Sequence, residues 1–213
     1  SAPRWLQRLA ARREWLLDGY FALTFGRNLG WKHALAKAPR ELAALPVVQR
    51  ELTFVTLTKN PYSWLLSLYA RPYNQHRAPQ EFHQFLAAPW PTVGREQAGT
   101  EFTDPVDLWN RKNRAYMDLA QGLPTLNLTY ERLLADPEGI VTDAARRFSW
   151  RWRRAGFENL VTSTKDGRKG FDDYRRYYLE ETWRAKLDGA AIDAINQRVD
   201  PQIMDYFGYV RLD

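Results

Sequence analysis

The chain has 213 residues, of which 45% are hydrophobic, so it is long enough to bury a full core, and its formal net charge is +6. It contains no cysteine, which excludes disulfide frameworks and thiolate chemistry, and its three histidines lack metal-ligand spacing, so no metal site is predicted. The positive charge favours anionic ligands such as nucleotides, glycans or nucleic acids.

No apolar run reaches the length of a membrane span, and the first residues do not resemble a secretion signal. We therefore expect a cytoplasmic protein with no transmembrane segment. Its length and even composition predict a single domain over residues 1–213.

Hydrophobic periodicity predicts helices and strands in alternation along the first half of the chain. The predicted elements are an amphipathic helix over 3–17, a short strand over 30–35, a short helix or turn over 38–45, a buried strand over 52–58 and a helix over 62–70. The strand over 52–58 is the clearest of these, because it is rich in β-branched and apolar residues.

The second half of the chain is predicted to be mainly helical. Its predicted elements are a helical turn or two over 81–88, a loop over 89–103, a helix over 105–121, a strand over 125–130, and helices over 137–148, 170–186, 190–199 and 201–207. Asp104 and Pro105 are a typical cap and first residue for the helix that they open.

Apolar strands alternating with longer helices predict an α/β fold, in which helices flank both faces of a parallel sheet. Ligands of such sheets bind beyond the carboxyl ends of the strands. Lys59 and Glu131 both follow predicted strands directly, so we expect them near such an end.

The segment 52–73 carries the strongest functional pattern. Its strand ends at Lys59, and Asn60 and Pro61 open a helix whose first N–H groups and dipole favour an anion. Ser67 follows eight residues after Lys59, and its side chain is expected to lean back toward the helix N-terminus. Ammonium and hydroxyl are therefore predicted to converge on one phosphate, the alternative being an ordinary buried strand–helix unit.

Lys59, Asn60, Pro61 and Ser67 resemble the 3′-phosphate-binding element of PAPS-dependent sulfotransferases, where PAPS is 3′-phosphoadenosine 5′-phosphosulfate. The usual cation of that family is arginine, and Lys59 keeps the charge without the bidentate fork. The resemblance implies a P-loop nucleotide-hydrolase-like sulfotransferase domain. It also implies sulfuryl transfer from PAPS to the hydroxyl or amine of an acceptor such as a carbohydrate or phenol, leaving adenosine 3′,5′-bisphosphate, without a metal.

Two later segments resemble the same family. Residues 126–147, with the pair Tyr130-Glu131, look like the strand and helix of its later half, where the pair is mainly architectural. Arg168, Lys169 and Gly170 match the late loop that closes over the 3′-phosphate, although the family's following Gly-x-Trp-Lys is absent. The resemblance implies donor binding by these three residues; a solvated basic turn is the alternative.

Trp31-Lys32-His33 resembles the strand on which sulfotransferases place a lysine and a histidine. The resemblance implies that His33 removes the acceptor proton, a role suited to an imidazole, and that Lys32 steadies charge on the sulfuryl group. Lys32 and His33 are adjacent, whereas the family spaces them by one residue, so on a regular strand they would face opposite sides. A packed, hydrogen-bonded histidine is the other interpretation of His33.

The glycine-rich phosphosulfate loop with which the family begins does not occur in this sequence. Residues 4–9 resemble the helix that follows this loop, so the first strand and the loop are expected upstream of residue 1 or are lost. Two other functions stay open: another nucleotide-dependent phosphotransferase, and a non-catalytic nucleic-acid or glycan binder that uses the arginine- and aromatic-rich run 146–157.

Overall fold

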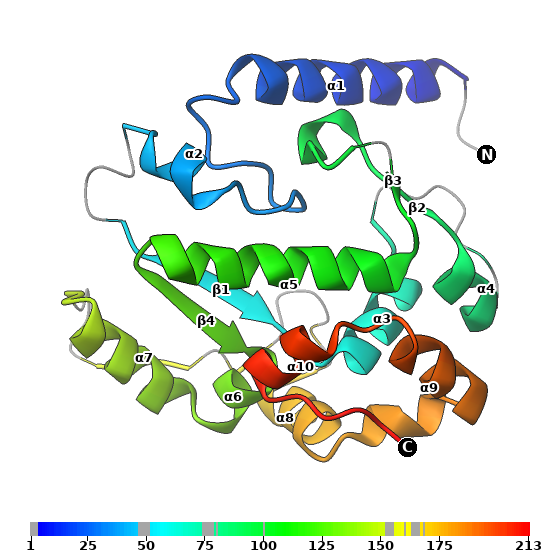
Figure 1. The fold of residues 1–213 in the computed structure, drawn as a ribbon, viewed down its shortest axis with the longest axis vertical. Helices are drawn as coiled ribbons and strands as arrows, with labels where there is room; N and C mark the ends of the chain where they lie inside the picture. Colours follow the sequence, from blue (N-terminus) through cyan, green and yellow to red (C-terminus); the bar gives the residue numbers. More distant parts are fainter. Residues whose placement is uncertain are drawn as a thin grey trace. The chain divides into compact units, whose positions relative to one another are not determined.

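The computed structural model (Figure 1) describes residues 4–46, 52–73, 79, 81–99, 101–151, 156–159, 161–162, 167 and 169–213. The chain forms two compact units. Unit 1 contains residues 1–52 and 73–123, and unit 2 contains residues 53–72 and 124–213. That these units form one functional domain stays a prediction.

Unit 1 is mainly helical. Its elements are α1 (Arg4–Leu23), α2 (Pro39–Ala43), α4 (Phe82–Ala87), β2 (Trp90–Pro91), the 3-10 helix η2 (Gly94–Glu96), β3 (Glu101–Phe102) and α5 (Pro105–Gly122). Trp90 of β2 pairs antiparallel with Phe102 of β3, so the two ends of the predicted loop 89–103 are held together. Trp90, Phe102 and Trp109 are fully buried and anchor the core of this unit.

Unit 2 contains a small parallel sheet flanked by helices, which confirms a mixed α/β architecture. Its elements are β1 (Phe54–Thr58), α3 (Pro61–Ala70), β4 (Thr125–Thr129), α6 (Tyr130–Ala135), α7 (Pro137–Arg147), α8 (Phe171–Leu179), the 3-10 helix η3 (Thr182–Lys186), α9 (Gly189–Asn196) and α10 (Pro201–Phe207). The described residues of the sheet form two strands, β1 and β4, which lie side by side and point the same way (Figure 1).

The two faces of this sheet differ in chemistry. On one face Thr56 is buried and donates a hydrogen bond of 2.6 Å from Oγ1 to Asn127 Oδ1, and Asn127 Nδ2 donates to the hydroxyl of Tyr206. On the other face Val55 and Leu57 are about half exposed. Among the described residues, the cover predicted for both faces of the sheet is therefore incomplete along β1.

The C-terminal residues of unit 2 are tied to α3. The hydroxyl of the buried Tyr62 accepts the Leu212 N–H at 3.0 Å and donates to Asn196 Oδ1, while Asn196 Nδ2 donates to the Leu212 carbonyl at 2.7 Å. The Tyr62 ring also stacks on Trp183, with centroids 6.2 Å apart. These contacts hold α3 in place, and with it the residues at the end of β1.

Most of the predicted helices and strands are confirmed within a few residues, and two differences are informative. The strand predicted over 30–35 is wrong. The chain turns there, because Gly30 has a φ of 100° and the Ala34 N–H bonds to the Trp31 carbonyl at 2.9 Å. The helix predicted over 170–186 is two helices, α8 and η3, because Glu181 has a left-handed φ of 51° that an α-helix cannot contain.

Candidate functional site

Lys59 lies directly after β1, at the carboxyl end of a parallel strand, and contacts two hydroxyls of unit 2. Its Nζ donates to Ser67 Oγ at 2.8 Å and to the Tyr178 hydroxyl at 2.9 Å, and it lies 4.7 Å from the centroid of the Tyr178 ring. The structure therefore brings Lys59 and Ser67 together, at the spacing from which the sequence predicted a shared ligand. The contact with Tyr178 is not among those predicted from the sequence.

Helix packing holds the Tyr178 ring beside the ammonium. Tyr178 is buried on α8, and Tyr130 of α6 meets it edge to face with centroids 4.9 Å apart. Burial, together with the neighbouring hydroxyls and the Glu131 charge, raises the pKa of Tyr130 to about 12. Tyr130 therefore stays neutral at physiological pH. The Tyr178 ring presents its π-face and its hydroxyl to the Lys59 ammonium.

The turn after β1 is fixed by backbone contacts. Asn60 Oδ1 accepts the Tyr62 N–H at 3.1 Å and caps α3, whose first residue is Pro61, as the sequence predicted. Glu131, at the start of α6, accepts the Asn60 N–H at 3.0 Å and the Tyr209 hydroxyl at 2.9 Å. This contact agrees with the architectural role expected for Glu131. Burial and the Glu131 charge raise the pKa of Tyr209, so its hydroxyl stays a donor.

The predicted basic loop is described only in part. Arg168 lies outside the described residues. Lys169 is exposed, and Gly170 caps α8, with its N–H bonded to Asp173 Oδ2 at 2.9 Å. Gly170 precedes Tyr178 by eight residues, or about 12 Å of helix rise, so α8 itself separates Lys169 and Gly170 from the Lys59 contact.

His33 belongs to an aromatic cluster of unit 1. Its ring stacks on Tyr73 with centroids 4.2 Å apart and meets Trp31 edge to face at 4.8 Å. The Arg95 guanidinium lies over the Trp31 ring, 4.4 Å from the ring centroid. The ring of His33 is thus held in one orientation, whereas Lys32 is exposed in the same turn. Because this segment is a turn, the strand rule that separated the two side chains does not apply.

Lys112 of α5 completes this cluster. Its Nζ donates to the His33 carbonyl at 2.7 Å and to the Tyr73 hydroxyl at 3.0 Å. Burial lowers the pKa of Lys112 to about 8, although the Glu96 charge opposes the shift, and burial raises the pKa of Tyr73. Lys112 therefore titrates near physiological pH within hydrogen-bond distance of the histidine backbone.

Tyr178 and Lys112 are not among the site residues predicted from the sequence, although the pattern around each indicates that it lies on a buried helix face. Tyr178 continues the spacing of Phe171 and Tyr174 along one helical face, which predicts a buried ring. Lys112 lies four residues after the buried Leu108, on the inward side of α5, where a lysine requires special partners. Neither signal identifies the partner, which comes from a distant part of the chain.

Among the described helices, none is both long and apolar enough to cross a membrane. The His, Asp and Glu side chains of the described ranges do not gather in groups of three or more that could hold a metal ion.

No protein-family model, curated protein or solved structure matches this chain.

Proposed function

We propose that the chain is a PAPS-dependent sulfotransferase of the P-loop type, in which Lys59 and Ser67 bind the donor's 3′-phosphate. The observation that carries this proposal is the 2.8 Å contact between Lys59 Nζ and Ser67 Oγ at the carboxyl end of β1. This pair has the spacing and the position after a parallel strand that the resemblance implies, with a lysine in place of the family's usual arginine. The resemblance also implies donor binding by Arg168, Lys169 and Gly170, although α8 separates Lys169 and Gly170 from the Lys59 contact.

The contacts suit a phosphate physically. The Lys59 ammonium lies within hydrogen-bond distance of two hydroxyls, those of Ser67 and Tyr178. These three groups supply donors that a dianionic group needs. Ser67 Oγ donates to the Ser63 carbonyl at 2.9 Å, so its proton would turn from that carbonyl to the phosphate. Positioning and charge stabilisation are what this class of transfer requires of a protein.

Calorimetric titration tests this assignment. The ligands are adenosine 3′,5′-bisphosphate and adenosine 5′-monophosphate, which differ by the 3′-phosphate. Lys59→Ala should weaken the bisphosphate by about tenfold or more and the monophosphate little, because a charge-assisted contact is worth about 1.5–3 kcal/mol. Ser67→Ala should show a smaller loss with the same selectivity.

Lys186→Ala is the matched control. Lys186 is an exposed lysine of unit 2 that contacts a tyrosine hydroxyl, that of Tyr177, at 3.1 Å. It should leave both affinities unchanged. Equal losses of both nucleotides in Lys59→Ala would show that the 3′-phosphate is bound elsewhere.

His33 is the proposed general base, as the resemblance implies. Its imidazole would take the acceptor proton while the new bond forms between acceptor oxygen and sulfur and the bond from sulfur to the 5′-phosphate oxygen breaks. His33→Ala should reduce turnover without changing bisphosphate affinity. His83→Ala, which changes an exposed histidine of the same unit, should keep wild-type turnover. Unchanged turnover in His33→Ala would remove it from the mechanism.

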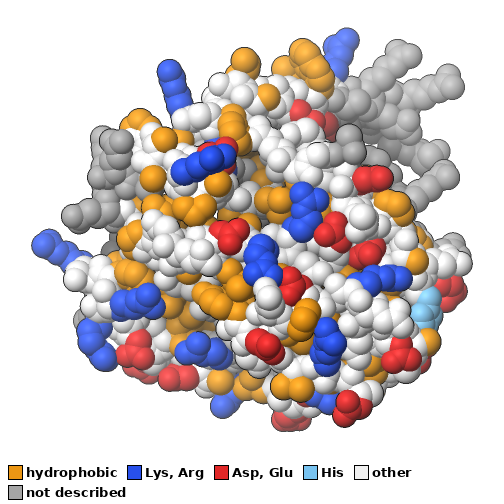
Figure 2. Space-filling view, in the orientation of Figure 1, with side chains coloured by type: hydrophobic (Ala, Val, Ile, Leu, Met, Phe, Trp, Pro, Cys, Tyr) orange, Lys and Arg blue, Asp and Glu red, His pale blue; other side chains and the backbone are white. Residues whose placement is uncertain are grey.

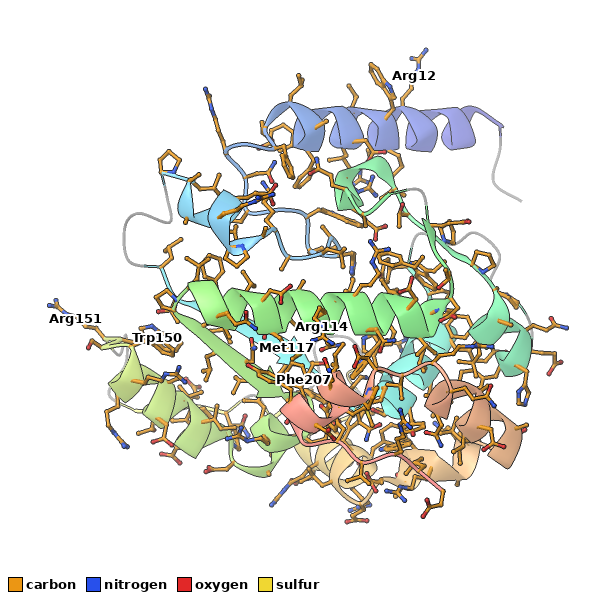
Figure 3. The ribbon with its side chains drawn as sticks, in the orientation of Figure 1. Arg12, Arg114, Met117, Trp150, Arg151 and Phe207 are labelled. Carbon is orange, nitrogen blue, oxygen red and sulfur yellow. The ribbon has the colours of Figure 1, made fainter. Side chains whose placement is uncertain are left out.

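A nucleic-acid or glycan binder is the second candidate, because of the residues after α7. Phe148 and Trp150 stack with centroids 5.6 Å apart, and the Arg147 guanidinium lies 4.9 Å from the Phe148 ring. Figure 3 shows Trp150 and Arg151 just beyond α7, with Arg151 pointing away from the protein. Salt-sensitive retention on single-stranded DNA without bisphosphate binding would favour this candidate.

A further inference from the structure

The outer face of α1 exposes four large hydrophobic side chains. Leu16, Tyr20 and Leu23 follow one another at spacings of four and three residues and so form one stripe, with Trp15 beside it. Their exposed fractions are 74% for Trp15, 62% for Leu16, 58% for Tyr20 and 90% for Leu23. Clusters of exposed apolar side chains of this size mark interaction surfaces.

The acidic residues of α1 are turned to the opposite face. Asp18 Oδ1 accepts hydrogen bonds from the Arg95 backbone N–H and, at 2.8 Å, from its Nη1, and Glu14 pairs with Nη2. Arg95 itself is buried. Arg12 and Arg13 are exposed, and Figure 3 shows Arg12 projecting from the side of α1 that is turned away from η2. The outer face therefore combines apolar and cationic groups, as Figure 2 shows along its upper edge.

We propose that the outer face of α1, formed by Trp15, Leu16, Tyr20, Leu23 and the flanking Arg12 and Arg13, docks on a membrane surface that contains anionic lipids. Rings of Trp and Tyr prefer the level of the lipid headgroups, and leucines insert between the acyl chains. Arginines beside them bind headgroup phosphates. The helix would lie in the plane of the membrane surface, which is compatible with its not being apolar enough to cross it.

The charges on this face argue against the two other occupants. Arg12 and Arg13 lie at one end of the stripe, and the exposed Arg27 follows four residues after Leu23 at the other. A second copy, packed parallel or antiparallel, would bring like charges together. Nucleic acid would leave Leu16 and Leu23 without a role, because aliphatic side chains offer no π-face for a base.

Vesicle co-sedimentation of the full chain tests the proposal. The vesicles contain either phosphatidylcholine alone or a mixture of phosphatidylcholine and phosphatidylserine. We expect binding to the mixed vesicles that falls about tenfold or more in the variant Trp15→Ser/Leu23→Ser, because each buried apolar side chain contributes strongly to partitioning. Arg12→Glu/Arg13→Glu should abolish the preference for phosphatidylserine while circular dichroism shows an unchanged fold.

Val210→Ser is the matched control, because Val210 is an equally exposed apolar residue (79%) of unit 2. It should bind vesicles as the wild type does. Three results would overturn the proposal: no binding of the wild type to mixed vesicles, undiminished binding of the Trp15/Leu23 variant, or a dimer in light scattering that this variant dissociates. None of these depends on nucleotide binding, so the sulfotransferase proposal is tested separately.

Discussion

Lys59 Nζ, at the end of β1, donates a 2.8 Å hydrogen bond to Ser67 Oγ on the second turn of α3. Both side chains are half-buried, and Tyr178 from α8 adds a second acceptor for the same ammonium. The contact joins a strand end, the following helix and a helix far along the chain. The contact therefore stabilises the free protein, and it is also the proposed binding site for a phosphate.

A double-mutant cycle measures this contact directly. Lys59→Met and Ser67→Ala should each lower the free energy of unfolding by about 0.5–1.5 kcal/mol, because each removes one hydrogen-bond partner. The double variant should lose less than the sum, with a coupling of about 0.5–1 kcal/mol in urea denaturation. Lys186→Met combined with Ser67→Ala should be additive, since Lys186 contacts Tyr177 instead. An additive Lys59/Ser67 cycle would show that the contact contributes nothing.

Two substitutions of Tyr178 separate the contribution of its hydroxyl to stability from that of its ring. Tyr178→Phe keeps the buried ring against Tyr130 and the cation–π contact and should cost about 0.5–1.5 kcal/mol of unfolding free energy. Tyr178→Ala leaves a cavity and should cost about 3–5 kcal/mol. Tyr177→Phe changes the neighbouring, more accessible hydroxyl and should shift thermal stability little. If Tyr178→Phe and Tyr177→Phe lowered the unfolding free energy equally, the hydrogen bond between Lys59 and Tyr178 would contribute no more to stability than an accessible hydroxyl does.

Glu131 holds the turn after β1 through two hydrogen bonds. Glu131→Gln keeps the shape but loses the charge that strengthens its bonds to the Asn60 N–H and the Tyr209 hydroxyl. We expect a loss of about 1–3 kcal/mol in urea denaturation. Glu180→Gln, at an exposed position after α8, should change the unfolding free energy by less than about 0.5 kcal/mol. A Glu131 variant as stable as this control would contradict the structural role.

Lys112 makes stability depend on pH. Its pKa is about 8 in the folded chain and 10.5 ordinarily, so between these values the unfolded chain binds more protons. Stability should therefore rise with pH, by about 1 kcal/mol between pH 8 and pH 9. Urea denaturation at these pH values measures the rise.

Lys112→Met should remove that rise, whereas Lys32→Met, at an exposed position of the same unit, should retain it. The rise of stability with pH ends near pH 10. Above that pH the unfolded chain loses the Tyr73 proton before the folded chain does, because folding raises the pKa of Tyr73, so stability falls. A wild-type curve that is flat between pH 8 and pH 9 would mean that Lys112 is not buried as described.

The turn at residues 30–35 shows how local patterns mislead. Trp31, His33 and Leu35 alternate as in a strand, but Asn28 Oδ1 accepts the Gly30 N–H at 2.9 Å and starts a turn instead. The position of His33 is then set by Tyr73 and Lys112, which the local sequence does not contain. Periodicity predicted the longer elements well, because their apolar faces repeat over several turns.

The sequence by itself determined the strand–turn–helix segment from β1 to α3. Helix geometry fixes how residues eight apart lie, and Pro61 and Asn60 define where the helix starts, so the meeting of Lys59 and Ser67 followed from spacing alone. Only the tertiary structure decided that Tyr178, 119 residues away, meets Lys59 and that Lys112, 79 residues away, meets His33. Such contacts depend on which helix faces pack together, and that choice is made by the buried surface of the whole unit.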